Sequence, residues 1–457
     1  MYGRPRLGSE TFGLSARTEL ADAVIFDLNG QRLFETIGCE HPREVHLNSN
    51  RRVPPVWLMG LSNTTLGFST GLVFFVLPQL MAAEHIPELR IAALTAMAMS
   101  PNFWAVMLSP MLDVRFSRRW YATVFAMAAA VSASVAILNL RHLVVLEAAM
   151  VLCVTAAALS GAALGGWLSN ITDPNSTNTL SKWMNIALIG GTGASAMLGA
   201  EVVHHLSVVL ASALLGGMIL LPSAIFVVIP APGPDRRLAG ESFSQFNREV
   251  LALLRRREVV VVLILFLSPC SSFALTNLLG GLGGDFHASA WAVSLAGGAG
   301  AIAPGILGCQ LFPMIAKRMK LRSFYLANGI VGSVFTLSLI VLPHTPSTFT
   351  LALFGEFLFQ AIAFAVQLGI VFEAIGPNNP LAATTFAFLT AATNVPVTYM
   401  MVADGHTYSI SGISGILAID GSMGIAACIM AGILLARFDS KASRPGDERV
   451  VKQAVSG

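Results

Sequence analysis

Long uninterrupted apolar runs are the feature of this sequence that most constrains its fold. A helix needs about 20 mostly apolar residues to cross the hydrocarbon core of a bilayer. Twelve such runs lie at residues 56–81, 91–111, 120–140, 143–168, 183–201, 207–229, 259–279, 291–314, 323–342, 349–372, 385–403 and 412–436. The runs are continuous rather than alternating, which excludes the strands of a membrane barrel. We therefore expect an all-α membrane protein with twelve transmembrane helices.

The overall composition excludes a water-soluble protein. Hydrophobic residues make up 54% of the sequence and charged residues only 12%, whereas soluble domains carry roughly 25% charged residues. Surface area grows too slowly with mass for a soluble fold of 457 residues to hide so much apolar surface. A cytosolic enzyme and a nucleic-acid-binding module are therefore excluded, and the expected environment is a lipid bilayer.

The basic residues predict which ends of the runs face the cytoplasm. Most of the basic residues between the runs lie in the connections after even-numbered runs. They are Arg115, Arg118, Arg119, Lys182, Arg236, Arg237, Arg248, Arg255, Arg256, Arg257, Lys317, Arg318, Lys320 and Arg322. The connections after odd-numbered runs carry Arg90 and Arg141. Cytoplasmic loops of membrane proteins are enriched in Lys and Arg. We therefore expect both termini in the cytoplasm.

The order of the runs predicts two halves of six helices each. The first run begins at residue 56 and the seventh at 259, and the later runs follow at nearly the same offset. Two parallel six-helix repeats are the architecture of major facilitator transporters. The expected parts are a disordered cytoplasmic tail at 1–55, an N-terminal half at 56–229, a cytoplasmic linker at 230–258, a C-terminal half at 259–436 and a cytoplasmic tail at 437–457. Phe243, Phe246 and Val250 follow one another at helical spacing, which predicts an amphipathic helix in the linker.

Ionisable residues inside the apolar runs are candidates for coupling transport to protons. A charged side chain at the bilayer centre costs about 3 kcal/mol on insertion scales, so such residues tend to be functional. Glu356, Asp420 and Glu147 meet this description. A buried carboxyl can hold a proton and release it when its surroundings become wet, because desolvation disfavours the charged form. We predict this role first for Glu356; the alternative for each residue is a structural hydrogen bond to a neighbouring helix.

Uncharged polar residues within runs 1, 5, 10 and 11 predict a substrate path. They are Asn63, Thr64, Asn185, Gln360, Gln367 and Asn394. Such side chains either line a polar cavity or hold helices together by hydrogen bonds, and the sequence leaves both roles open. In a transporter with two repeats, the substrate site is expected near the bilayer midplane between the halves.

The short segment after run 2 is a candidate cytoplasmic gate. Asp113 is followed there by Arg115, Arg118 and Arg119. A carboxylate that faces several guanidinium groups forms strong charge-assisted hydrogen bonds, which can hold one closed state and later release it. The same arginines also fit a purely topological role, and both interpretations stay open.

No pattern in the sequence predicts catalysis, a metal or a cofactor. Glu201, His204 and His205 offer only three ligands at the end of one run, without second-shell partners. The Gly-x-Gly-x-x-Ala patterns at 191–196 and 298–303 lie inside apolar runs without a preceding strand, so they do not predict a nucleotide site. We expect the chain not to be an enzyme. A membrane-embedded lipid acyl- or glycosyltransferase is the alternative class.

Four short motifs carry a resemblance to a known family. They are Gly-Phe-Ser-Thr-Gly-Leu at 67–72, Leu-Ser-Pro-Met-Leu-Asp at 108–113, Phe-Gly-Glu at 354–356 and Ala-Thr-Thr-Phe-Ala-Phe-Leu at 383–389. In these motifs and their order, the chain resembles the AmpG-type muropeptide permeases, in the peptide/acetyl-coenzyme A branch of the major facilitator superfamily. The resemblance covers about residues 56–436.

The resemblance implies a secondary transporter of the bacterial inner membrane that works by alternating access. Its partners would be protons and a small amphipathic solute resembling a muropeptide, a peptide or a siderophore. Where those permeases carry an intramembrane Lys, this chain has Ala105, so a siderophore-like solute is as plausible as an anionic muropeptide. We expect a monomer. A uniporter or an exporter of the same fold is the alternative mode of transport.

Overall fold

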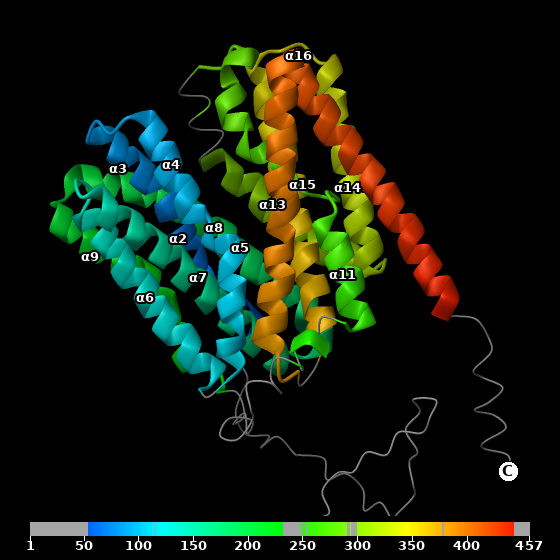
Figure 1. The fold of residues 1–457 in the computed structure, drawn as a ribbon, viewed down its shortest axis with the longest axis horizontal. Helices are drawn as coiled ribbons and strands as arrows, with labels where there is room; N and C mark the ends of the chain where they lie inside the picture. The colour runs from blue at the N-terminus through cyan, green and yellow to red at the C-terminus, as the bar shows by residue number, and fades with distance from the viewer. Residues whose placement is uncertain are drawn as a thin grey trace, which may run out of the picture. The chain divides into compact units, whose positions relative to one another are not determined.

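A computed structural model of the chain describes residues 54–442, with gaps at 115, 232–247, 249, 253–254, 290–292, 294–298 and 377–378. The described residues form helices joined by short connections, and they contain no strand (Figure 1). This confirms the expected all-α architecture. The predicted tail at 1–55 and most of the predicted linker helix, including Phe243 and Phe246, lie outside the described residues.

The first six expected runs contain the helices of the N-terminal half. In chain order these are α1 (Val56–Leu61), α2 (Thr64–Gly71), η1 (Leu72–Val76), α3 (Leu77–Ala83), α4 (Glu88–Met99), α5 (Pro101–Trp104), η2 (Ala105–Asp113), α6 (Arg118–Leu138), α7 (Leu143–Ile171), η3 (Pro174–Ser176), α8 (Thr177–His205), α9 (Val208–Leu220) and η4 (Leu221–Val227). The helices pack closely: a Cβ added at Gly67 of α2 would lie 2.5 Å from the carbonyl oxygen of Leu188 in α8. Such small residues let helix backbones approach one another in membranes.

The last six expected runs contain the helices of the C-terminal half. These are α11 (Arg257–Leu267), η5 (Ala274–Asn277), η6 (Leu279–Phe286), η7 (Ala299–Ala301), α13 (Ile302–Ala316), α14 (Leu321–Ser338), η8 (Leu339–Val341), α15 (Pro346–Ile375) and α16 (Ala382–Ala442). The last element contains two arms, because the backbone of Gly412 is not helical (φ 61°, ψ −149°) and bends the chain back on itself. Figure 1 shows this bend at the top of the C-terminal half.

Eight helical segments of the described residues are long and apolar enough to cross a membrane. One of them, Ala382–Arg437, contains both of the last two expected runs. Of the three other expected runs, 183–201 lies in α8, which is long but less apolar, and 291–314 is described only in part. The third, 259–279, does not form one continuous helix.

The expected continuous helix at 259–279 ends at Leu267. Pro269 disfavours a helical backbone at Ser268, which takes φ −80° and ψ 150°. Positive φ values at Ser271 (56°) and Phe273 (46°) follow, and the chain continues in 3₁₀ turns. Irregular backbone survives at membrane depth only where protein covers it. Residues 270–273 are all buried, and the Ser271 hydroxyl donates to the Tyr325 carbonyl of α14 at 2.9 Å.

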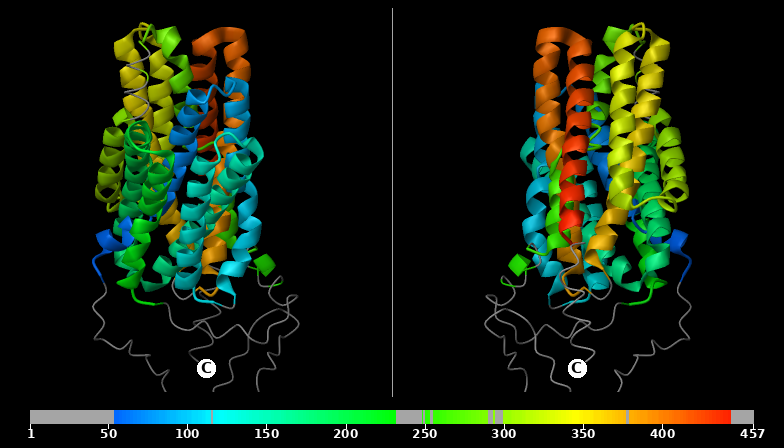
Figure 2. Two further views of the ribbon diagram at one scale, coloured as in Figure 1. Left: turned by 90° about the vertical axis from the view of Figure 1, so that its left-hand side faces the viewer. Right: turned by 90° about the vertical axis from the view of Figure 1, so that its right-hand side faces the viewer.

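The described helices alternate in direction, so their connections gather at the two ends of the bundle. Figure 2 shows the start of α1 and the end of α16 at the same end, which we call the terminal side. The connection between η2 and α6 and the one between α15 and α16 lie there. The connection between α14 and α15 and the bend at Gly412 lie on the opposite side.

Candidate functional site

A cavity of about 330 Å³ lies between the two halves. Its wall is formed by α2, α5, η2, α7 and α8 of the N-terminal half and by α15 and α16 of the C-terminal half. Ligand sites in proteins usually have volumes of roughly 300–1,000 Å³, so a small molecule can be enclosed here. Because both halves form the wall, a change in their relative position would change the cavity.

The polar side chains of the wall are all uncharged. They are Asn63, Ser69, Thr70, Asn102, Asn185, Gln367, Thr390, Thr393 and Asn394. No Asp, Glu, Lys, Arg or His is found among the described residues that line the cavity. The remaining wall is apolar and includes Phe74, Phe364 and Phe386. The site therefore offers hydrogen bonds and aromatic surface, but no counter-charge for an ion.

Four of the six residues predicted to line a substrate path lie in this wall: Asn63, Asn185, Gln367 and Asn394. The other two do not line the cavity. The Thr64 hydroxyl donates to the Leu61 carbonyl of the preceding turn (2.6 Å). The Gln360 amide donates to the Thr276 hydroxyl in η5 (2.7 Å). These two side chains fit the alternative of structural hydrogen bonding.

Two carboxamides of the wall are without a protein partner. Neither Asn102 in α5 nor Asn394 in α16 forms a side-chain hydrogen bond within the described part of the chain, and both are half-buried. By contrast, the amide nitrogen of Asn63 donates to the Met184 carbonyl (3.0 Å) and that of Asn185 to the Phe364 carbonyl (3.3 Å). Asn102 and Asn394 therefore present both a donor and an acceptor to the cavity, one from each half.

Asn102 was not among the residues predicted from sequence. The available signal was the Ser-Pro-Asn triplet at 100–102, which interrupts an otherwise apolar run. The triplet coincides with the change from α4 to α5. Polar residues in an apolar run are a stronger indication of a site when they accompany a helix irregularity, because such irregularities line cavities in membrane proteins.

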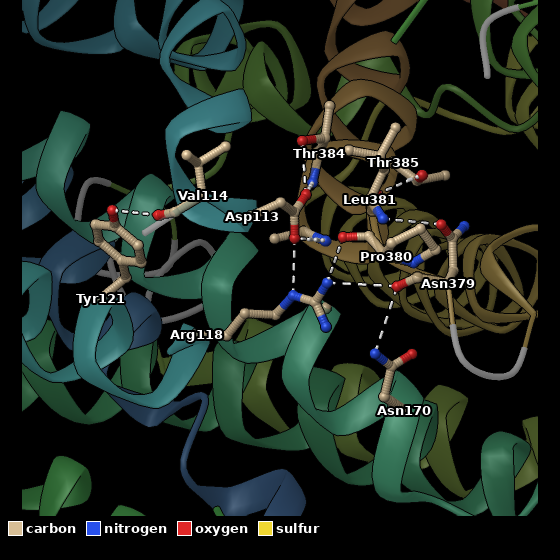
Figure 3. A network of polar contacts seen from close by, with 12 residues as sticks. Asp113, Val114, Arg118, Tyr121, Asn170, Asn379, Pro380, Leu381, Thr384 and Thr385 are labelled. Carbon is tan, nitrogen blue, oxygen red and sulfur yellow. Dashed lines mark hydrogen bonds and ion pairs between the residues drawn. The ribbon is translucent and has the colours of Figure 1, made fainter. Parts of the chain in front are cut away.

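On the terminal side, a buried polar network joins the two halves (Figure 3). Asp113 at the end of η2 accepts four hydrogen bonds. Its Oδ1 accepts from Nε of Arg118 (2.7 Å) and the backbone N–H of Ala383 (3.2 Å). Its Oδ2 accepts from the backbone N–H (2.8 Å) and the hydroxyl (2.7 Å) of Thr384. The first amides of a helix have no partner within the helix, so Asp113 of one half caps α16 of the other.

Arg118 extends the network from the N-terminal half to the connection before α16. Its side chain is 1% exposed, and its Nη2 donates to the carbonyls of Pro380 (2.7 Å) and Asn379 (3.3 Å). Asn170 of α7 donates to the same Asn379 carbonyl (3.4 Å). The predicted partner Arg119 is half-buried and makes no ion pair with any described residue, and Arg115 lies outside the described residues.

Further contacts between the halves lie between this network and the cavity. The Ser181 hydroxyl of α8 donates to the Ala365 carbonyl of α15 at 2.5 Å. A Cβ at Gly165 of α7 would meet the ring of Phe386, so α7 and α16 touch here. Within the described ranges, every hydrogen bond between the halves lies on the terminal side or at mid-depth. The described state is therefore closed toward the terminal side.

Solved structures share this arrangement of two halves. The chain has a TM-score of 0.61 with the human organic anion transporter MFSD10 (16% identity, covering 82% of this chain and 98% of that one). The TM-score with the E. coli fucose:proton symporter FucP is 0.63, at 12% identity, and the match covers 82% of this chain and 98% of that one. The TM-score with a bacterial homologue of the iron transporter ferroportin, solved in an outward-facing state, is 0.58, at 14% identity, and the match covers 84% of this chain and 100% of that one. The chain has the major facilitator fold. No family model and no curated protein sequence matches it.

In this major facilitator fold, the three ionisable residues predicted for coupling lie apart from the cavity. Glu356 and Asp420 are buried in the C-terminal half. Glu147 is half-buried in the second turn of α7, in the N-terminal half. The structure adds a third buried acid to the C-terminal half, Asp404 of α16, which is 0% exposed. The sequence analysis missed Asp404, because it placed residues 404–411 in a loop between two runs.

No group of three or more His, Cys, Asp or Glu side chains in the described residues could hold a metal ion. His205 lies within 3.3 Å of Glu201, and both side chains are largely exposed. Cys270 and Cys428 are also both buried. These pairs lie outside the cavity wall.

Proposed function

We propose that this protein is a secondary transporter that moves a small, uncharged, amphipathic solute by alternating access. The observation that carries the proposal is the cavity between the two halves, with a wall that is entirely uncharged in the described residues and contains two unpartnered carboxamides. Major facilitator transporters bind substrate between their halves near the bilayer midplane. The position of the cavity between the two halves supports this proposal.

The chemistry of the wall selects the class of solute. Transferring a charged group from water into an apolar site without a counter-charge is far more costly than transferring a hydroxyl or an amide that regains its hydrogen bonds. The carboxylates of a free muropeptide or of an anionic siderophore would find no cation here. Hydroxyl or amide groups of a neutral solute would pair with Asn102 and Asn394, while its apolar part would lie against Phe364 and Phe386.

The network around Asp113 supports alternating access. It joins η2 and α6 of one half to the first turn of α16 in the other. Breaking it would separate the halves on the terminal side, and the cavity would then open there. If the terminal side is cytoplasmic, as the placement of Lys and Arg predicts, the described state faces outward. Asp113 and Arg118 would act as the cytoplasmic gate.

We further propose that transport is driven by protons through Glu356. This side chain is fully buried, and its Oε1 accepts from the Thr336 hydroxyl at 2.6 Å. An intramembrane acid that can hold a proton in one conformation and lose it in another provides coupling without any cofactor. Uncharged solutes need such a device to be accumulated, because the membrane potential does not act on them.

A ligand screen tests the substrate class. Purified protein would be heated with uncharged, anionic and cationic solutes of matched size, because a ligand of the native state raises the Tm. We expect stabilisation by the uncharged set only, and counterflow of the stabilising solutes in liposomes. Stabilisation by anions alone, or binding without any counterflow, would contradict the proposal.

Substitutions in the wall test the site. Asn102→Leu and Asn394→Leu should each weaken binding of the uncharged solute about fivefold, because each removes hydrogen bonding worth about 1 kcal/mol. Thr64→Val is the matched control, since Thr64 does not line the cavity and its hydroxyl donates only to the Leu61 carbonyl of the preceding turn. Equal losses in the control and in the cavity variants would show that the cavity is not the binding site.

A further inference from the structure

Three acidic residues gather within the C-terminal half, away from the cavity. Asp404 and Asp420 lie eight residues before and eight residues after the bend at Gly412, so each is about 12 Å along its arm from the bend. The two arms of α16 (Figure 1) therefore each carry an acid at about the same distance from the bend. Glu356 lies ten residues into α15, which begins on the same side as the bend. All three are thus near the middle of the bundle.

The three carboxyls are close together and lack partners. Glu356 bonds to Thr336 of α14, and Gly421, next to Asp420, packs against Ser333 and Leu337 of the same helix. Glu356 and Asp404 are 0% exposed and Asp420 is 7% exposed. Neither oxygen of Asp404 has a hydrogen-bond partner, nor does Oε2 of Glu356 or Oδ1 of Asp420. Buried polar atoms without partners are rare in proteins and indicate an unseen ligand.

On α16 itself, His406 lies two residues after Asp404 but is exposed, and the helices packed around the cluster supply no cation either. Within the described chain, the charged residue of α14 is Arg322, and those of α11 are Arg257 and Glu258. All three lie in the first turn of their helix, on the terminal side. Neither η5 nor η8 contains an ionisable residue. The same cluster does not have the arrangement of a metal site. Protons are therefore the ligands that fit these oxygens.

The packing leaves little room for water or a larger ion. A Cβ at Gly421, next to Asp420, would lie 2.6 Å from Leu337 of α14, and one at Gly424 would meet the Ser333 hydroxyl. A Cβ at Gly355, next to Glu356, would meet the ring of Phe335. Like charges held together in such a low-dielectric site cannot ionise together.

The Thr336 hydroxyl indicates how the proton on Glu356 is held. Its oxygen lies 3.1 Å from the Gly332 carbonyl and 2.6 Å from Glu356 Oε1. A hydroxyl has one hydrogen to donate, so it can serve only one of these acceptors at a time. When it donates to Gly332, as Thr residues in helices commonly do, the short contact to Glu356 is satisfied by a proton on the carboxyl. Rotation of one hydroxyl thus accommodates both protonation states.

We propose that Glu356, Asp404 and Asp420 form one shared proton-binding site that holds at least two protons at neutral pH. The site deepens the proton coupling proposed above and rests on it for its role in transport. Asp404 is its added member, and its position on one arm of α16 connects the site to the cavity, because Thr393 and Asn394 of the same arm line the cavity wall. Movement of this arm would change the surroundings of Asp404 and Asp420 together.

Infrared spectroscopy of the purified protein tests the site without any solute. The carbonyl stretch of protonated carboxylic acids would be recorded during a titration from acid to alkaline pH. We expect this band at neutral pH in the wild type. E356Q, D404N and D420N should each reduce it, and the triple variant should remove the whole contribution of the site. D285N is the matched control, because Asp285 lies in the same half but accepts a hydrogen bond from the Tyr408 hydroxyl (3.0 Å).

The outcomes separate this proposal from the transport proposal. Absence of the band in wild-type protein at neutral pH, or a band unchanged in the three variants, would overturn the site whether or not the protein transports a solute. Loss of the band on replacing choline chloride by sodium chloride at constant pH would also overturn it, in favour of a sodium site. If one variant fails to fold, the wild-type titration and the sodium test still decide.

Discussion

Asp113 and Asp404 are both aspartates buried in the same bundle, but their surroundings differ completely. Asp113 is 6% exposed and accepts four hydrogen bonds, one of them from a buried guanidinium group. Asp404 is 0% exposed and has no hydrogen-bond partner at either oxygen. Burial alone therefore does not decide what an intramembrane acid does. The donors around it decide whether it can keep its charge.

This difference suits Asp113 and Asp404 to different roles in the proposed mechanism. We infer that a carboxylate bonded by donors from both halves, like Asp113 beside Arg118, holds the relative position of the halves. A carboxyl without donors is stable only with a proton, and it can release that proton when a conformational change brings water or a donor. In the proposed mechanism, Asp113 holds one relative position of the halves, and Asp404 gains or loses a proton when that position changes.

The largest expected effect comes from removing the guanidinium group. Arg118→Ala leaves the Asp113 carboxylate buried and without its ion pair, and breaking a buried pair typically costs about 3–5 kcal/mol. We expect a large fall in the Tm of the purified protein. Arg119→Ala is the control, because Arg119 makes no ion pair with a described residue. Similar Tm values for the two variants would show that the network does not hold the halves together.

A smaller loss is expected from removing one donor to Asp113. Thr384→Val keeps the size of the side chain but deletes the hydroxyl that donates to Oδ2 at 2.7 Å. Hydrogen bonds to charged groups contribute about 1.5–3 kcal/mol, and three donors remain. The Tm should fall less than in Arg118→Ala, and labelling of a cysteine placed at Ser181 should increase, because this interface would open more often. Thr385→Val is the control, since that hydroxyl donates within its own segment to Leu381.

Most of the architecture could be predicted from sequence, and the failures have physical causes. Apolar runs report the helices because lipid permits few other backbones. They do not report their ends: polar residues at 404–411 suggested a loop, while the first arm of α16 continues to Gly412 and places Asp404 inside the bundle. In the same way, the hydropathy of 259–279 conceals the effect of Pro269 on the preceding residue.

The pairing of side chains was harder to predict than their membrane depth. The sequence places three arginines near Asp113, and only the structure shows that the described partner is Arg118 while the other donors come from the start of α16. Those donors lie some 270 residues further along the chain. Contacts of that separation depend on how the two halves assemble, which local patterns do not encode.

Glu356→Gln should have a modest effect on stability and a specific effect on coupling. The amide keeps the shape of a protonated carboxyl and can still pair with the Thr336 hydroxyl. We expect the variant to bind and exchange the solute identified by the ligand screen, but to lose accumulation under an imposed pH gradient. The measurement is the ratio of gradient-driven accumulation to equilibrium exchange in liposomes. An unchanged ratio would remove Glu356 from the coupling mechanism.

The smallest effect on stability is expected for Asp404→Asn, and it is the sharpest test of the comparison. If Asp404 already holds a proton, the substitution exchanges one neutral group for another of nearly the same size, and the free energy of unfolding should change by less than about 1 kcal/mol. Asp113→Asn changes the same atoms but leaves Arg118 buried without its counter-charge, so it should cost about 3–5 kcal/mol. Both variants would be compared by thermal unfolding at neutral pH.

The pH dependence of Asp404→Asn completes this test. A site that binds more protons in the folded protein than in the unfolded chain stabilises the fold at low pH, and that stability is lost as the pH rises. The Tm of the wild type should therefore fall toward alkaline pH, and Asp404→Asn should flatten the decline because one proton fewer is bound. Asp285→Asn should decline as the wild type does. A decline for Asp404→Asn as steep as that of the wild type would mean that Asp404 binds no extra proton in the folded state, and the contrast with Asp113 would then be wrong.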